Sequence, residues 1–140
     1  VYVCTRSERE RERARRLGAA WVGGYEQAPP VPLDAAVTFA PVGSVVIDAL
    51  GALDKGGVVA INAIHLDHIP EFDYDALWWE RQIRSVANVT RADVADLVQL
   101  AAEIPIVTDV QRYELGHANR ALRDLAAGQV SGAAVLEVRS

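Results

Sequence analysis

Short apolar runs alternate with helical patterns along this sequence, and that alternation constrains the fold more than any other feature. Residues 58–63 are apolar at nearly every position, which is typical of a strand buried on both faces of a parallel sheet. Residues 42–53 instead place their apolar side chains at helical spacing. The sequence therefore predicts an α/β fold with a mostly parallel sheet and right-handed crossovers.

The first nineteen residues predict a strand, a turn and a helix. Residues 1–4 form an apolar run with β-branched and aromatic side chains. Ser7 is followed three residues later by a glutamate, the spacing of a capping box, and Gly18 is suited to end the helix. Thr5, Arg6 and Ser7 are thus expected at the carboxyl end of a strand, where open α/β sheets bind ligands.

The remaining elements follow from the same two patterns. Gly-Gly and proline-containing stretches separate them and mark turns. We find no internal repeat and no second hydrophobic core, so residues 1–140 are predicted to form one partial domain. Further strands are expected at 19–22, 34–40, 58–63, 82–87, 106–113 and 133–138, helices at 42–53, 74–80, 90–101 and 115–125, and a turn at 54–57.

Composition argues against some classes of binding partner and indicates the cellular compartment. A net charge of −5 argues against nucleic acid or an anionic membrane as a partner, and no apolar run reaches the roughly 18 residues of a membrane span. The single cysteine, Cys4, excludes an internal disulfide and fits a reducing cytosol, so a cytoplasmic location is predicted. The chain lacks methionine and begins inside an apolar strand, so we expect it to be the carboxy-terminal part of a longer polypeptide.

Four stretches, in this order, resemble the cofactor domain of zinc-type alcohol dehydrogenases, the medium-chain dehydrogenase/reductase family. They are VYVCTRS followed by ARRLGA, then DAAVTFAPVGS, LDKGGVVAINAIH, and YELGHANRALRDLAAGQVSGAAVLEV. The resemblance covers essentially the whole chain and implies a Rossmann-like parallel sheet with flanking helices. It also implies that about 106–113 and 132–140 return towards the catalytic domain in the full-length enzyme.

The sequence departs from this family in what it lacks. The first Rossmann strand, its G-x-G-x-x-G turn and the amino-terminal catalytic domain are absent, so zinc would enter only through that absent domain. In the strand order 3-2-1-4-5-6, the strands at 1–4 and 34–40 would each lose a neighbour, which leaves backbone polar groups unpaired. We expect the position of the missing strand, between the strands at 1–4 and 34–40, to be filled. The candidates are further residues of the same polypeptide, a strand of another copy or a rearranged carboxy-terminal strand. A homodimer or a strand-exchanged oligomer is therefore predicted.

The turn after the first strand predicts the cofactor. NAD-preferring Rossmann domains usually carry a carboxylate here for the ribose 2′-hydroxyl, whereas this chain offers Thr5, Arg6 and Ser7. Arginine can pair a phosphate through two hydrogen bonds, so NADP is predicted, with NAD possible. Glu10 stands where NADP-dependent relatives often carry lysine. In the alternative interpretation, Ser7 only caps its helix and Arg6 is a solvated turn residue.

The resemblance assigns further cofactor contacts to the loops after later strands, which by themselves are also compatible with ordinary turns. The predicted residues are Ala40, Pro41 and Val42 beside the nicotinamide ribose, and Ala63, Ile64, His65, Val86, Ala87 and Asn88 around the carboxamide. No catalytic residue is assigned. His65, Asp67 and His68 make only a weak metal-site pattern, so no metal ligand is assigned either. Trp78 and Trp79 fit a core or a subunit interface equally well.

These patterns together predict the cofactor-binding segment of an NADP-dependent alcohol dehydrogenase, which acts on small alcohols or aldehydes when whole and is inactive alone. Two alternatives remain open. One is a zinc-independent quinone or enoyl reductase of the same superfamily. The other is a non-catalytic Rossmann-like module that oligomerises by strand pairing.

Overall fold

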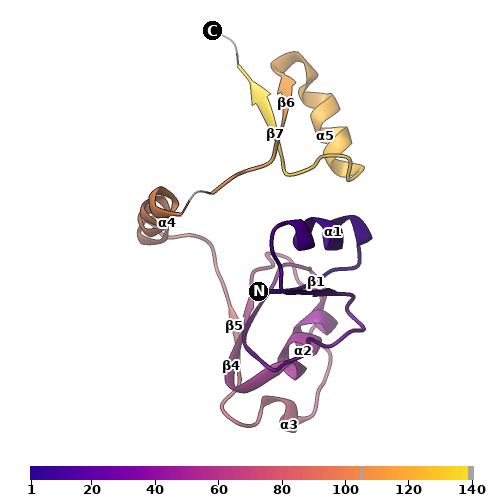
Figure 1. Ribbon diagram of the computed structural model, residues 1–140, viewed down its shortest axis with the longest axis vertical. Helices are drawn as coiled ribbons and strands as arrows, with labels where there is room; N and C mark the ends of the chain where they lie inside the picture. Colours follow the sequence, from indigo (N-terminus) through magenta and orange to yellow (C-terminus); the bar gives the residue numbers. More distant parts are fainter. Residues whose placement is uncertain (105, 139–140) are drawn as a thin grey trace. The chain divides into compact units, whose positions relative to one another are not determined.

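The computed structural model describes residues 1–104 and 106–138, which form two compact units, Val1–Asn88 and Val89–Ser140. The first unit carries five strands and three helices in strand–helix alternation (Figure 1). They are β1 (Tyr2–Cys4), α1 (Glu8–Arg16), β2 (Trp21–Gly23), β3 (Leu33–Thr38), α2 (Gly43–Gly51), β4 (Leu53–Ile61), α3 (Tyr74–Leu77) and β5 (Gln82–Ser85).

The second unit is a single helix followed by a strand–helix–strand motif. Its elements are α4 (Arg91–Glu103), β6 (Val110–Glu114), the 3-10 turn η1 (Leu115–His117), α5 (Ala118–Ala126) and β7 (Ala133–Glu137). Strands β6 and β7 pair in parallel, and α5 contacts both. The Tyr113 hydroxyl donates to Asp124 over 3.1 Å, which fixes α5 to β6.

All strand pairs in the described residues are parallel, which confirms the predicted α/β class with flanking helices. The strands form three sheets rather than one, with the orders β1-β2, β3-β4-β5 and β6-β7. The break between the first two sheets lies between β1 and β3, where the sequence predicted a missing neighbour. Each of these two strands therefore has one edge along which no strand of the described residues pairs.

The core of the first unit lies between α2 and the β3-β4-β5 sheet. Val46 and Leu50 on α2 are fully buried, as is Val59 on β4. Their spacing on α2 is one helical turn, so both side chains face the sheet. Leu33 and Ala36 of β3 pack against the same cluster, and so this core fixes the position of β3 relative to α2.

Helix boundaries follow local signals that the sequence carries. Ser7 caps α1 by accepting from the Glu10 N–H over 3.4 Å, and Gly18 ends this helix with a φ of 88°. Helix α4 begins at a complete capping box, in which Thr90 and Asp93 each bond the other's backbone N–H.

The predicted turn at 54–57 is wrong. Residues 54–57 were expected to be a turn, but β4 already begins at Leu53, which pairs with Leu33 before the register shifts. Leu53 is buried at 2% exposure, so its side chain anchors the start of the strand in the core. The glycines nevertheless act as a local irregularity, since Gly56 has a φ of 73°.

Candidate cofactor-binding site

Nine of the predicted cofactor residues lie at the carboxyl end of the strands of the three-stranded sheet. Because β3, β4 and β5 are parallel, the loops that follow them all leave from the same edge. The loop after β3 holds Ala40, Pro41 and Val42; the loop after β4 holds Ala63, Ile64 and His65; the loop after β5 holds Val86, Ala87 and Asn88.

Hydrogen bonds connect neighbouring loops at this carboxyl end of the sheet. The Asp67 carboxylate accepts from the backbone N–H of Gly43, which ties the loop after β4 to the start of α2. The Val86 N–H donates to the carbonyl of Ile61 over 3.0 Å, so the residue after β5 still pairs with β4. Ile64 and His65 are exposed, so the loop after β4 is open to solvent at these two residues.

The other three predicted residues, Thr5, Arg6 and Ser7, form the turn between β1 and α1. The Thr5 N–H donates to Gly23 over 3.0 Å, which continues the pairing with β2 into the turn. Ser7 is committed to capping α1. The Arg6 guanidinium lies 5.9 Å from the centre of the Tyr25 ring, a distance at which a cation is attracted to the ring face.

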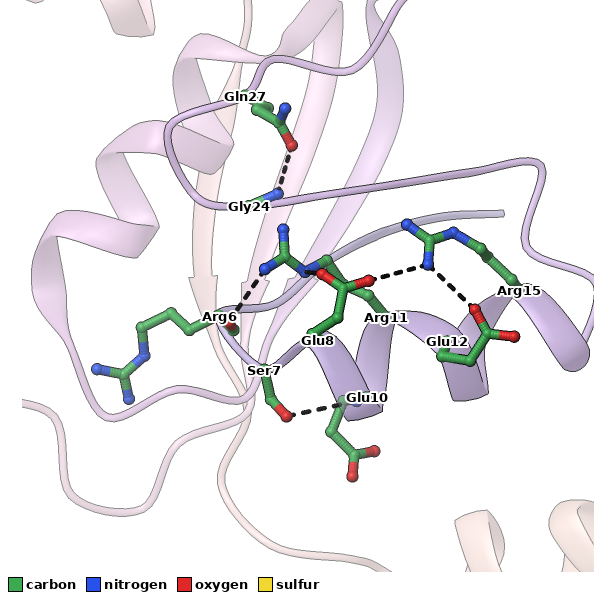
Figure 2. A network of polar contacts seen from close by, with 9 residues as sticks. All are labelled: Arg6, Ser7, Glu8, Glu10, Arg11, Glu12, Arg15, Gly24 and Gln27. Carbon is green, nitrogen blue, oxygen red and sulfur yellow. Dashed lines mark hydrogen bonds and ion pairs between the residues drawn. The ribbon is translucent and has the colours of Figure 1, made fainter.

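The cations of α1 near this turn are engaged by its carboxylates (Figure 2). Arg15 bonds both Glu8 and Glu12, at 3.1 and 3.2 Å. Arg11 lies 3.1 Å from Glu8 and donates to the Arg6 carbonyl over 3.3 Å. These contacts are exposed ion pairs with a small net stabilisation each, but they fix which charges remain available.

Arg6 differs from these arginines. Within the described part of the chain, no carboxylate pairs with its guanidinium, and Figure 2 shows it pointing away from the ion-pair network of α1. Glu10, the residue that could repel an anion, is paired with Arg9 at 3.3 Å. The turn therefore presents a positive charge at the carboxyl end of a parallel strand.

A cavity of about 730 Å³ lies between β1 and the α2–β3 layer. Of the twelve predicted residues, Thr5 and Ala40 line it, and the other ten do not. Sequence reasoning missed Tyr25, Thr38 and Asp48 as cavity residues. Tyr25 and Thr38 stand at the carboxyl ends of β2 and β3, so the rule that singled out Thr5 could have found them. Asp48 lies within a helix and carries no such signal.

Cys4 also faces this cavity. Although the residue is exposed as a whole, partial desolvation of the thiol and, second, the negative charge of Asp48 raise the pKa of Cys4 above its ordinary value. The thiol is therefore poorly ionised at neutral pH, which argues against a role as a nucleophile.

The described residues contain no group of three or more histidine, cysteine, aspartate or glutamate side chains placed to hold a metal ion. The zinc that the family resemblance implies thus has no fitting ligand set in this part of the molecule. Nor do the described helices include one long and apolar enough to cross a membrane.

Comparison with known proteins gives one close sequence relative, while no family model matches the chain. The chain is 51% identical over 137 residues to a probable alcohol dehydrogenase, AdhA, of Mycobacterium tuberculosis (strain CDC 1551 / Oshkosh). That match covers 97% of this chain but 40% of the relative. The chain therefore spans less than half the length of the protein that it resembles.

Solved structures give the same fold at low sequence identity. A putative alcohol dehydrogenase from Sinorhizobium meliloti 1021 matches with a TM-score of 0.82 at 19% identity, over 99% of this chain and 43% of its own. The CAD of Helicobacter pylori, complexed with NADP(H), matches with a TM-score of 0.74 at 17% identity, over 97% of this chain and 40% of its own.

Parallel strands joined by helices, with candidate ligand residues at their carboxyl ends, define the class of a Rossmann-like cofactor domain. The M. tuberculosis relative, at 51% identity, confirms the predicted resemblance to alcohol dehydrogenases. The chain matches a part of an alcohol dehydrogenase in sequence, and it shares its fold with alcohol dehydrogenases of known structure.

Proposed function

We propose that this chain is the cofactor-binding segment of an NADP-dependent alcohol dehydrogenase, with the Thr5–Arg6–Ser7 turn receiving the 2′-phosphate of the cofactor. The observation that carries the proposal is the Arg6 guanidinium at the carboxyl end of β1, with which no carboxylate of the described residues forms an ion pair. Arginine matches the geometry of a phosphate and stays charged at all relevant pH values. A carboxylate at this turn would favour the NAD ribose instead.

Two further observations support NADP over NAD. Glu10 is neutralised by Arg9, so its charge repels a phosphate less than its position in the sequence suggests. A structural neighbour, the H. pylori CAD, is complexed with NADP(H). In the same proposal, the loops after β3, β4 and β5 hold the nicotinamide end of the cofactor, since all three lie at the carboxyl end of the sheet.

The chain supplies binding groups but not a complete catalytic site. It contains no G-x-G-x-x-G turn for the pyrophosphate, and its described residues form no metal site. When bound, the nicotinamide would supply or accept the hydride, and the partner would be a small alcohol or aldehyde bound by the rest of the enzyme. We therefore expect no hydride transfer by the 140 residues alone, and we expect a cytoplasmic, dimeric whole protein.

The test measures the contact with the 2′-phosphate by itself. It uses nucleotides without a pyrophosphate, so the missing G-x-G-x-x-G turn does not affect the result. The isotopically labelled chain is titrated with 2′,5′-ADP and, separately, with 5′-AMP, while the backbone resonances of residues 5–7 are followed by NMR. We expect 2′,5′-ADP to bind at least about tenfold more tightly, the effect of roughly 1.4 kcal/mol. Arg6→Asp should abolish that preference. Arg16→Asp, the same charge change at the far end of α1, should retain it.

Equal binding of both nucleotides, or loss of the preference in the Arg16→Asp control, contradicts the NADP assignment. Absence of binding by either nucleotide, with a folded chain, favours the non-catalytic module instead. A whole enzyme that reduces quinones or enoyl substrates and not aldehydes would favour the zinc-independent reductase.

A further inference from the structure

One residue of α1, Arg11, bonds two successive carbonyl groups of the turn between β1 and α1. Its backbone N–H donates to the Ser7 carbonyl over 2.9 Å, as expected where Ser7 is the residue that caps the helix. Its guanidinium donates to the Arg6 carbonyl over 3.3 Å. The backbone of the turn is therefore tied to the first turn of α1 at both Arg6 and Ser7.

The guanidinium of Arg11 is itself held in a fixed orientation. Its Nε lies 3.1 Å from the Glu8 carboxylate, while one Nη donates to the Arg6 carbonyl (Figure 2). Because the guanidinium is planar and rigid, two contacts through different nitrogens fix its plane. The Arg11 side chain is 23% exposed, against 48% for Arg15, so its contacts are the less solvated of the two.

Glu8 connects this contact to the rest of α1. Its other carboxylate oxygen lies 3.1 Å from Arg15, which also bonds Glu12 over 3.2 Å. The charge of Arg11 is thus already balanced by a carboxylate. Arg11 and Arg15 share the partner Glu8, but of the two only Arg11 also donates to the backbone of the turn.

Arg6 depends on this backbone for its direction. Its side chain is exposed, and its guanidinium lies 5.9 Å from the centre of the Tyr25 ring, close to the limit of about 6 Å for attraction between a cation and a ring. Figure 2 shows it pointing away from the ion pairs of α1. A contact this long leaves the guanidinium adjustable, so the conformation of the turn decides where the side chain leaves the backbone.

We propose that Arg11 is a positioning residue for Arg6. Its hydrogen bond to the Arg6 carbonyl, oriented by Glu8, fixes the turn so that Arg6 faces a phosphate monoester at the carboxyl end of β1. The inference rests on the proposed function and adds that selectivity for the 2′-phosphate depends on a residue that does not contact the phosphate. A cation that is ordered beforehand binds an anion more tightly, because less freedom is lost on binding.

Lysine at position 11 separates this role from a simple effect of charge. It retains the positive charge, but its ammonium group ends one bond short of the arginine Nη atoms and lacks their planar fork. If Arg11 only added positive charge near the phosphate, Arg11→Lys would leave selectivity unchanged. If Arg11 only stabilised α1, Arg15→Lys would have the same effect, since Arg15 shares the carboxylate of Glu8.

The first measurement is nucleotide selectivity. The 140-residue chain, Arg11→Lys and Arg15→Lys are each titrated with 2′,5′-ADP and with 5′-AMP. We expect Arg11→Lys to lower the preference for 2′,5′-ADP by about threefold or more, the usual effect of ordering one side chain on binding. Its affinity for 5′-AMP should not change, because that nucleotide lacks the 2′-phosphate. The matched control Arg15→Lys should retain the preference.

The second measurement needs no nucleotide. Backbone order parameters of residues 5–7, obtained by ¹⁵N relaxation, should be about 0.85 in the unaltered chain and in Arg15→Lys, and should fall to about 0.6 or below in Arg11→Lys. Thermal unfolding of each chain establishes that the variants fold. A variant that only weakened α1 would lower the order parameters along the helix and not within the turn.

Three results would overturn the proposal. The first is a preference for 2′,5′-ADP that survives Arg11→Lys in full, and the second is an equal loss in Arg15→Lys. The third is a turn whose order parameters do not differ between the unaltered chain and Arg11→Lys. An unaltered chain without any preference overturns the proposed function and this inference together, whereas a preference that persists in Arg11→Lys overturns this inference alone.

Discussion

The Asp67 carboxylate accepts a hydrogen bond from the backbone N–H of Gly43 and so joins the loop after β4 to the first turn of α2. The two residues are 24 positions apart in the sequence. A carboxylate at a helix N-terminus also interacts favourably with the helix dipole. This contact holds together two of the three loops that are proposed to hold the nicotinamide end of a cofactor.

Gly43 is expected to tolerate no side chain. A Cβ at this position would lie 2.1 Å from the His68 carbonyl oxygen, a backbone atom that cannot turn aside. We predict that Gly43→Ala destabilises the first unit by about 1–3 kcal/mol, the usual range for overpacking, as measured by urea unfolding.

Gly51, at the other end of α2, is the matched control. No atom lies within 4 Å of a Cβ built there, and alanine is the better helix former. Gly51→Ala should leave the stability unchanged or raise it by up to about 1 kcal/mol. Equal destabilisation by the two variants would contradict the close approach of the two loops.

The Cys4 side chain is exposed, and because its pKa is raised the thiol is expected to react mainly at raised pH. Burial is the larger cause of its raised pKa, and the negative charge of Asp48 is the second. Since the thiolate is the reactive form, the rate of alkylation should rise through a midpoint above that of an exposed cysteine. Asp48→Asn should lower this midpoint in part, because burial remains.

A pH–rate profile of alkylation measures both midpoints, and Asp34→Asn, an exposed change on β3, serves as the control. An unchanged profile for Asp48→Asn would show that the carboxylate does not act on the thiol. The stability consequence has a definite sign: the neutral thiol is the favoured form in the folded chain, so this contribution is lost as the pH rises through the folded pKa.

The capping box of α4 is expected to make this helix sensitive to acid. The pKa of Asp93 is lowered, first by the hydrogen bond from the Thr90 backbone and then by that from its hydroxyl. A carboxylate with a depressed folded pKa stabilises the helix above its unfolded pKa, and this contribution is lost as the pH falls through the folded value.

Thr90→Ala should therefore weaken α4, by about 1 kcal/mol as for other N-cap losses, and should also weaken its acid dependence. Thr90→Ser, which keeps the hydroxyl, should behave like the original chain. Amide exchange in 91–103 between pH 7 and pH 3 measures both effects. An Asp93 resonance that titrates at the same pH in the original chain and in Thr90→Ala would contradict the role of the box.

Local chemistry made part of this structure predictable from the sequence. Ser7 and Thr90 begin helices because a hydroxyl three residues before a helical N–H satisfies it, and Gly18 and Gly128 end helices because only glycine takes a positive φ without strain. The parallel class followed from continuous apolar runs such as 58–63. The unpaired edges of β1 and β3 followed from the absence of one strand in a known order.

The sequence by itself determined the class of fold, the helix caps and the cationic turn at Arg6, because each depends on residues a few positions apart. Only the tertiary structure decided which charged side chains are free of ion pairs among the described residues, which loops are in contact and where the cavities lie. Arg6 is distinguished from the neighbouring arginines by side-chain geometry, and Asp67 reaches Gly43 across 24 residues. Two cavities beside β1, of about 730 and 570 Å³, exist because α1, α2 and β3 pack around a position that no described residue occupies. Such relationships arise from packing between distant segments, which no local pattern encodes.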